Sequence, residues 1–285
     1  MTAANQPRID DRPLAGLCVM VTRAESAADP LADELRRRGA QVVVQPAIRI
    51  SPPPTWAPVD RALARLHEFD WLVFSSANGV RFLLERRRDR GLGARLPRVA
   101  AMGPGTAAAL GEFGVRADLT PAEFRAESLA DALIAEKGIR PICAQHPEGR
   151  SGKLDVSPFP LAGRRFLLAR ASRGREVLAE RLTAAGATVE QIVVYTSTDV
   201  ERPNADIQAM LDAGQVDWIT VTSSAIARSL ARLFGGRLRR ARLASISPLT
   251  SGVLRELGYE PAAEAAEYTL AGLAAAIVKY SSRSA

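Results

Sequence analysis

The chain has 285 residues, enough for about two domains of ordinary size, and a composition that is 47% hydrophobic and 24% charged excludes a disordered protein. Two cysteines and two histidines are too few for a Cys/His zinc site, an iron–sulfur cluster or a disulfide framework. The net charge of +7 favours anionic partners, but at 5% aromatic residues the chain lacks the side chains that stack on nucleic acid bases.

Residues 1–13 contain no apolar run behind a basic stretch, and no apolar stretch approaches the ~18 residues that span a bilayer. We therefore expect a cytoplasmic protein without a membrane or nucleic acid partner. No long apolar seam is left over for a second subunit, so we expect a monomer.

The sequence repeats itself at an interval of about 147 residues, which slips to 144 at the last match. Four matches occur in the same order, which indicates an internal duplication of one α/β unit. The matching segments are 21–24 with 168–171, 69–71 with 216–218, 75–76 with 222–224, and 102–106 with 246–250.

Short runs rich in Val and Ile alternate with segments of helical period, which predicts parallel sheets covered by helices. The Pro- and Gly-containing segment 139–163 separates the two copies and predicts an irregular connection. In the first copy the expected strands are 17–22, 42–50, 70–75, 98–102 and 115–118. In the second copy they are 164–169, 189–197, 216–222, 242–246 and a short strand near 259.

Two of these strands are longer than the usual five or six residues and occupy equivalent places in the two copies. The first, 42–50, contains Pro46, and the second extends over 189–198. Such strands are able to cross between lobes and pair with each other. The expected fold class is therefore α/β, with two similar doubly wound parallel-sheet lobes, a two-stranded β ladder that joins them, and a cleft between them.

Small and polar residues follow the predicted strands, at the edge where open α/β sheets bind ligands. Helix N-termini offer free N–H groups and the positive end of the helix dipole, so several around one cleft would bind a polyanion. The same residue types are the preferred N-caps of any helix, which gives each of them a purely structural alternative. The candidate binding residues are Arg23, Ser75, Ser76, Asn78, Gly103, Thr106, Thr222, Ser223, Ser224, Ser247, Thr250 and Ser251.

Other familiar sites have little support. Gly103-Pro104-Gly105 lacks the third glycine of a dinucleotide-binding turn, and the phosphate-binding loop of nucleoside triphosphatases is missing. His67 falls inside a predicted helix and His146 in the irregular connection, which argues against a Ser-His-Asp hydrolase. We interpret Asp70 and Asp217, at the amino ends of their strands, as structural. Tyr195 is the remaining candidate for proton transfer, with simple packing as its alternative, because its strand borders the expected cleft.

These residues, in this order, resemble the uroporphyrinogen-III synthase family along nearly the whole chain. The motifs that carry the resemblance are Val21-Thr22-Arg23, Pro46, Asp70-Trp71, Ser75-Ser76-Ala77-Asn78-Gly79-Val80, Gly103-Pro104-Gly105-Thr106-Ala107, Tyr195-Thr196, Thr222-Ser223-Ser224 and Ser247-Pro248-Leu249-Thr250-Ser251. The chain departs from the repeat where Ser247 and Leu249 replace the glycines of the first copy.

The resemblance implies two flavodoxin-like lobes that exchange their first β–α units. One lobe would hold 1–41 and 199–285, the other 51–188, with 42–50 and 189–198 as connecting strands. It also implies a lyase that needs no metal or cofactor and takes its substrate from the enzyme that makes it. The family cyclises hydroxymethylbilane, a linear tetrapyrrole with eight carboxylates, to uroporphyrinogen III through a spiro intermediate.

In that family mechanism Tyr195 would assist the departure of the substrate's hydroxyl group. The N–H groups around Ser76, Thr106, Ser223 and Thr250 would hold the carboxylate arms, with Arg23 as an ion partner. Two alternatives stay open at this point: a non-catalytic two-lobed binder of a small polyanion, and a regulatory or nucleic-acid-binding protein.

Overall fold

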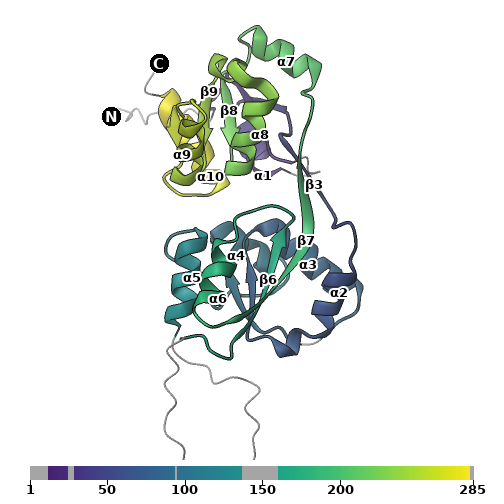
Figure 1. Cartoon of the computed structure of the whole chain (residues 1–285). Coiled ribbons are helices and arrows are strands. Elements are labelled where there is room, and N and C mark those ends of the chain that lie inside the picture. Colours follow the sequence, from purple (N-terminus) through teal and green to yellow (C-terminus); the bar gives the residue numbers. More distant parts are fainter. Residues whose placement is uncertain (1–11, 25–28, 94, 137–159, 283–285) are drawn as a thin grey trace, which may run out of the picture. The chain divides into compact units, whose positions relative to one another are not determined.

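The computed structural model describes residues 12–24, 29–93, 95–136 and 160–282, so most of the expected connection 139–163 lies outside the described residues. The described residues fall into two compact units (Figure 1). Unit 1 lies within Met1–Ile50 and Thr198–Ala285, and unit 2 lies within Ser51–Ser197.

Unit 1 contains a five-stranded sheet with the order β10-β9-β8-β1-β2, in which every pair of neighbours is parallel. Its elements are β1 (Cys18–Val21), α1 (Pro30–Arg37), β2 (Gln41–Val44), α7 (Ala205–Asp212), β8 (Trp218–Val221), α8 (Ser224–Phe234), the 3-10 helix η2 (Gly235–Arg240), β9 (Arg242–Ser245), α9 (Pro248–Glu256), β10 (Ala263–Glu264) and α10 (Leu270–Ser281).

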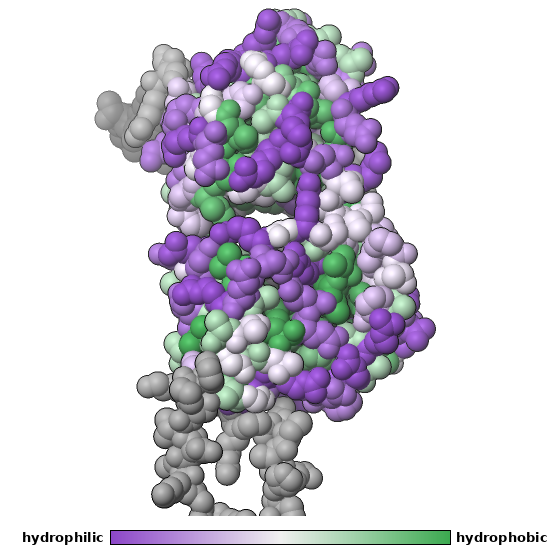
Figure 2. All heavy atoms as spheres, viewed as in Figure 1, coloured by the Kyte–Doolittle hydropathy of each residue, from purple (hydrophilic) through white to green (hydrophobic). Residues whose placement is uncertain are grey.

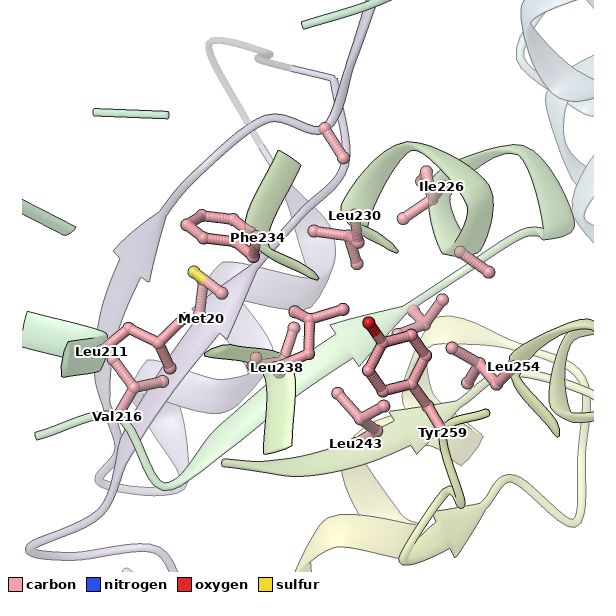
Figure 3. Close-up of a cluster of buried hydrophobic side chains, with 14 of the residues drawn as sticks. Met20, Leu211, Val216, Ile226, Leu230, Phe234, Leu238, Leu243, Leu254 and Tyr259 are labelled. Atoms are coloured by element: carbon pink, nitrogen blue, oxygen red, sulfur yellow. The ribbon is translucent and has the colours of Figure 1, made fainter. Parts of the chain in front are cut away.

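Helices cover both faces of this sheet. Side chains alternate along a strand, so Met20 of β1 packs in one cluster while its neighbours Val19 and Val21 pack in another. Figure 3 shows the first cluster, where Met20 lies among side chains that include Leu230 of α8 and Leu254 of α9. The second cluster contains side chains of α1 and α10. A sheet covered on both faces explains why every residue of β1 and β8 is buried.

Unit 2 contains the second sheet, with the order β3-β7-β6-β4-β5. Strands β7, β6, β4 and β5 are parallel to their neighbours in that series. Its elements are β3 (Ile48–Ser51), α2 (Ala57–Ala64), the 3-10 helix η1 (Leu66–Glu68), β4 (Trp71–Phe74), α3 (Ala77–Asp89), β5 (Arg98–Ala101), α4 (Pro104–Gly111), α5 (Ala126–Ala135), β6 (Arg165–Ala171), α6 (Val177–Ala184) and β7 (Thr188–Asp199).

This sheet is also covered on both faces. Trp71 and Val73 of β4 pack in one cluster with α5 and α6. The intervening residues Leu72 and Phe74 point to the other face and are fully buried, and α3 contacts β4 and β6. The first turn of α3 is thereby held close to the carboxyl end of β6.

Each sheet combines segments from the two sequence repeats. Strand β1, from the first repeat, pairs with β8 of the second repeat. Strand β6, from the second repeat, pairs with β4 of the first repeat. The pairings are those of an exchange of first β–α units, and both sheets are parallel and doubly wound, as the fold class predicts.

The expected single strand over 42–50 is wrong, because the structure divides it at Pro46. Gln45 and Ala47 still donate backbone hydrogen bonds to β1 and to Thr22, at 2.9 and 3.0 Å, but Pro46 has no N–H to donate. After this break the chain pairs with β7 as β3. The expected strand 189–198 is correct and forms the core of the 12-residue β7.

Strands β3 and β7 run in opposite directions. The Val200 N–H donates to the Ala47 carbonyl oxygen at 3.0 Å, and the Thr196 hydroxyl donates to the Ser51 carbonyl oxygen at 3.2 Å. Two strands that each pass from one unit into the other form the expected ladder.

Two short expected strands differ from the structure. No strand forms over 115–118, where Leu119 makes an isolated bridge to Ala100. The strand expected near 259 lies a few residues later, as β10. Both are edge segments, where few pairing partners fix the register.

Hydrophilic side chains predominate on the face shown in Figure 2, with separate hydrophobic spots among them. The longest helix in the described part of the chain, α3, has 13 residues, and none of the helices described is both long and apolar enough to cross a bilayer.

Candidate active site

In unit 2, two helices begin directly after neighbouring strands of the sheet. Helix α3 follows β4 with Ser76 as its N-cap, and α4 follows β5 with Gly103 as its N-cap. The carboxyl ends of parallel strands share one edge, so both helix N-termini lie at the same edge. The Ser76 hydroxyl oxygen accepts the N–H of Gly79 at 3.1 Å, while the N–H groups of Ala77 and Asn78 precede the first helical hydrogen bond.

Tyr195 lies at this edge on β7, and its hydroxyl group is 3.1 Å from the Ser76 hydroxyl oxygen. The phenol is 7% exposed, and its ring stacks on Phe82 of α3 with centroids 5.7 Å apart. Two predicted site residues therefore meet through their side chains, although 119 positions separate them in the chain.

A β-bulge turns Tyr195 toward α3. Arg170 of β6 is opposite Val193, but the next residue, Ala171, is opposite Tyr195, so β7 contains one extra residue at this point. Side chains of a strand alternate between faces, and an extra residue changes which of them share a face. With regular pairing Tyr195 would point away from the Ser76 side of the sheet.

Burial raises the pKa of the Tyr195 hydroxyl, and the hydrogen bond between Tyr195 and Ser76 and the charge of Arg173 oppose that rise. The phenol is accordingly neutral at physiological pH. A neutral, hydrogen-bonded phenol beside helix N-termini is able to donate one proton to a departing oxygen.

Sequence reasoning missed Phe82 and Arg173. Phe82 has the burial pattern of an ordinary helix residue, and nothing in the sequence distinguishes it from a core side chain. Three of the 38 basic residues are lysines, so the chain has 35 arginines, and the sequence does not single out Arg173 among them. Only the fold places it next to Tyr195. Its Nε also donates to the Ser197 hydroxyl at 3.2 Å, which ties it to β7.

The other predicted residues of unit 2 differ in how exposed their side chains are and in whether their N–H groups are already hydrogen-bonded. Ser75 is exposed and Asn78 is half-buried, next to the free N–H groups of α3. Thr106 is 7% exposed, and its N–H donates to the Gly103 carbonyl oxygen at 3.0 Å within the first turn of α4. The N–H of Gly105, in the same turn, is the one left outside helical bonding.

Gly103 has a packing explanation. A Cβ atom at this position would lie 3.1 Å from the Cβ of Phe124, too close to fit without movement. A Cβ at Gly105 would meet nothing within 4 Å. Phe124 therefore requires the first glycine, and the space above the second is open.

Unit 1 has an equivalent edge. Ser223 caps α8 and accepts the N–H of Ile226 at 3.2 Å, and Ser247 caps α9 and accepts the N–H of Thr250 at 3.4 Å. Thr222 and Ser224, beside the first cap, are half-buried. The structure thus repeats the hydroxyl cap of α3 at both helices of unit 1.

The side chains of two predicted binding residues of unit 1 lie in its interior. Ser251 is fully buried, its hydroxyl bonds to that of Ser245, and its N–H donates to the Ser247 carbonyl oxygen. Thr250 is 2% exposed, and its hydroxyl is 3.2 Å from that of Ser247. Both hydroxyls hold the first turn of α9 in place.

Arg23 follows β1 at the same edge of unit 1. Its Nη1 atom is 3.8 Å from the Asp29 carboxylate, too far for a hydrogen bond, and makes none with the residues that the structure describes. The side chain is 31% exposed. Arg23 is therefore a partly exposed charged side chain at this edge, and its buried Nη1 atom has no hydrogen-bond partner among the described residues.

Asp70 and Asp217 lie at the amino edges of their sheets, opposite the helix N-termini, and the prediction that they are structural residues is confirmed. Asp70 accepts the N–H of Arg165, the first residue of β6, and Asp217 accepts the N–H of Cys18, the first residue of β1, both at 2.8 Å. Each carboxylate fastens the first strand of the exchanged β–α unit.

Within the described ranges, no three His, Cys, Asp or Glu side chains gather closely enough to hold a metal ion. At the carboxyl edge of unit 2 the groups are a hydroxyl cap, helix N–H groups and one neutral phenol, and at the equivalent edge of unit 1 they are hydroxyl caps, helix N–H groups and Arg23.

Comparison with known proteins agrees with this arrangement. The family model described as "Uroporphyrinogen-III synthase HemD" matches residues 29–275. A uroporphyrinogen-III synthase from Synechococcus elongatus is 32% identical over 281 residues, covering 95% of this chain and 97% of that protein. One from Escherichia coli is 28% identical over 251 residues, with coverage of 86% and 93%.

Solved structures of the same name share the fold. A mutant uroporphyrinogen III synthase from the extremely thermophilic bacterium Thermus thermophilus matches with a TM-score of 0.61 at 16% identity, over 94% of this chain and 99% of that one. The Helicobacter pylori protein matches with a TM-score of 0.54 at 16% identity, over 92% and 99%. With the family model and the Synechococcus relative both matching most of its length, the chain belongs to the uroporphyrinogen-III synthase family.

Proposed function

We propose that this chain is a uroporphyrinogen-III synthase, a lyase of tetrapyrrole and haem biosynthesis. It cyclises hydroxymethylbilane to uroporphyrinogen III, inverts the terminal pyrrole and releases water. The observation that carries the proposal is the match, along almost the whole chain, to relatives of that name.

The substrate's eight carboxylates suit the two helix-bearing edges. In unit 2 the N–H groups of Ala77 and Asn78 receive carboxylate arms, and in unit 1 those of Ser224 and Ala225 do so, because each pair opens a helix with a serine N-cap. Arg23 adds a charged contact. Each unit thus offers N–H groups of its own to substrate carboxylates.

Tyr195 supplies the proton that the reaction needs. It donates to the hydroxyl group of the substrate as the C–O bond breaks, and the oxygen leaves with the bonding electrons as water. The nitrogen of the electron-rich pyrrole that bears the hydroxymethyl group supplies the compensating electrons, and loss of its N–H proton gives an azafulvene.

Ring closure follows at the substituted carbon of the last pyrrole and gives a spiro intermediate. That species fragments and recloses with the last ring inverted. The azafulvene nitrogen regains a proton when its methylene carbon is attacked, and the proton that the final ring carbon releases balances the one that Tyr195 donated. The bilane closes unaided to the type I isomer, so the protein's main contribution is to fix the conformation in which inversion occurs.

The direct test is to supply freshly generated hydroxymethylbilane, oxidise the products and separate the isomers. A predominance of the type III isomer supports the proposal, with the type I isomer from a protein-free reaction as the control. Type I isomer alone would reject it and leave a non-catalytic polyanion binder as the better interpretation.

We further propose that the protein acts as a cytoplasmic monomer that receives hydroxymethylbilane from the enzyme that makes it and needs no metal or cofactor. Light scattering of the purified protein tests the monomer, and full activity after dialysis against a chelator tests metal independence.

A further inference from the structure

The Ser76 hydroxyl has two hydrogen-bond partners in unit 2. The N–H of Gly79 donates to its oxygen at 3.1 Å, and the Tyr195 hydroxyl lies at 3.1 Å on another side. A serine hydroxyl has one proton to give. Among the described residues the Tyr195 oxygen is the acceptor within reach of that proton. When Ser76 donates to Tyr195, the Gly79 N–H and the Ser76 hydroxyl proton therefore both have an acceptor.

The opposite direction of this bond is less favourable. If Tyr195 donated to Ser76, the serine proton would have no acceptor among the described residues, and the phenol proton would be bound to the serine oxygen and not available to the substrate. Donation from Gly79 to Ser76 and on to Tyr195 aligns the bonds, and aligned bonds strengthen one another. Gly79 and Ser76, where this series of hydrogen bonds begins, lie at the positive end of the α3 helix dipole.

The backbone holds both partners in place. Gly79 lets α3 approach β6 closely, because a Cβ there would lie 3.3 Å from the Ala169 carbonyl oxygen and 3.3 Å from the Ser76 oxygen. Stacking on Phe82 fixes the Tyr195 ring, and the β7 bulge sets its direction. The contact between Ser76 and Tyr195 therefore depends on packing throughout this corner of unit 2.

We propose that Ser76 is a positioning residue for Tyr195: its hydroxyl, held by the first turn of α3, donates to the phenol oxygen and leaves the phenol proton free for the substrate. This inference rests on the proposed function, in which Tyr195 is the proton donor. It replaces a direct role of the Ser76 side chain in binding substrate.

The two roles predict different kinetics. A residue that only binds substrate raises KM when it is removed, whereas one that orients the proton donor lowers kcat. Removing the Ser76 hydroxyl should therefore lower kcat about tenfold, the factor that one hydrogen bond represents, with KM changed less than twofold.

Three substitutions distinguish the effect of losing the Ser76 hydroxyl from the effect of losing the N-cap of α3. Ser76→Ala removes both, Ser76→Gly removes the hydroxyl but is tolerated at an N-cap, and Ser76→Thr keeps both. We expect the alanine and glycine variants to lose kcat alike and the threonine variant to retain most of it. Thr269→Ala is the matched control, because Thr269 caps α10 of unit 1 through the N–H of Gly272 at 3.0 Å.

A second readout needs no turnover. The chain has four tyrosines, so tyrosine labelled with ¹³C at Cζ gives few signals, and Tyr195→Phe assigns the one of interest. In Ser76→Ala that signal should shift at neutral pH, and the phenol should ionise at higher pH, because the serine bond lowers its pKa. Arg173 is the charged group acting on the phenol and is unchanged in each variant.

The outcomes are distinct. An unmoved Tyr195 signal in Ser76→Ala, or a rise in KM with kcat intact, would overturn the positioning role while leaving the proposed function in place. A Tyr195→Phe variant with normal turnover would instead show that Tyr195 is not the proton donor. A shifted signal with reduced kcat in the alanine and glycine variants, and neither effect in Thr269→Ala, supports the inference.

Discussion

At the scale of single residues, the site depends on one weak acid. The Tyr195 phenol is buried, neutral and bonded to a serine cap, and no stronger acid lies in the surroundings described for it. This suits a substrate whose electron-rich pyrrole drives the loss of water, because the protein then has to supply little more than a proton and a fixed geometry.

The Tyr195→Phe variant tests this assignment. Phenylalanine keeps the stacking on Phe82 but has no proton to donate, so we expect kcat to fall about a hundredfold while KM changes little. The measurement is the initial rate of type III isomer formation, corrected for the unaided type I reaction. An unchanged kcat would remove Tyr195 from the chemistry.

The residue types at the carboxyl edges of the two sheets could be predicted from the sequence, but the role of each side chain could not. The pattern of hydroxyls after strands correctly located helix N-termini, because serine and threonine cap helices for local reasons. Whether a hydroxyl faces a ligand or the interior depends on packing that the sequence pattern does not encode. Ser251 and Thr106 were therefore assigned to ligand contacts and are buried, and Gly103 proved to make room for Phe124.

At the scale of elements, the approach of α3 to β6 decides where Ser76 lies. We expect Gly79→Ala to reduce the free energy of unfolding by about 1–2 kcal/mol and to lower kcat, because the added methyl would press on the Ala169 carbonyl and the Ser76 hydroxyl. Urea unfolding and steady-state kinetics measure the two effects.

Gly252→Ala is the matched control, since Gly252 lies in α9 with nothing within 4 Å of its added Cβ. Alanine is the better helix former, so this variant should gain about 0.5–1 kcal/mol of stability and keep its activity. Equal behaviour of the two alanine variants would contradict the close contact of α3 with β6.

The exchanged β–α units depend on the carboxylates at the amino edges. Asp217→Ala should lower the free energy of unfolding by about 2 kcal/mol, because the N–H of Cys18 loses a charged acceptor at 2.8 Å. Asp33→Ala, which breaks an exposed ion pair with Arg36, should cost about 0.5 kcal/mol. Urea midpoints compare them, and equal losses would show that Asp217 does not fasten β1.

The sequence pattern predicts which segments form strands and helices better than it predicts where each of them ends. Alternating apolar runs and helical segments correctly predicted the parallel strands, since burial on both faces of a sheet leaves a clear pattern. The break at Pro46 and the bulge in β7 depend on which neighbour each strand finds, and no local signal states that. The bulge matters most, because it sets the direction of Tyr195.

At the scale of the whole molecule, a duplicated chain carries the same helix-cap chemistry at one sheet edge in each of its two units. The repeat was visible in the sequence, and the parallel pairing of β1 with β8 and of β4 with β6 agrees with the exchange that the family resemblance implies. Composition alone would have left the choice between an enzyme and a binder open.

The net charge of +7 predicts that binding weakens as salt rises. Raising the ionic strength from about 0.01 M to about 1 M shortens the Debye length from about 30 Å to about 3 Å, so KM should increase while kcat stays constant. Arg23→Gln should raise KM at low salt and flatten this dependence. Arg88→Gln, which removes the same charge from an exposed position, should do neither.

The helix N-termini of each unit are proposed to bind substrate carboxylates, and NMR tests this directly. Amide NMR spectra of the ¹⁵N-labelled protein, titrated with uroporphyrinogen III under anaerobic conditions, follow the N–H groups that open α3 and α8. We predict that the signals of Ala77 and Asn78 in unit 2 and of Ser224 and Ala225 in unit 1 shift together, with one dissociation constant. Shifts confined to a single unit, or absent from both helix N-termini, would contradict it.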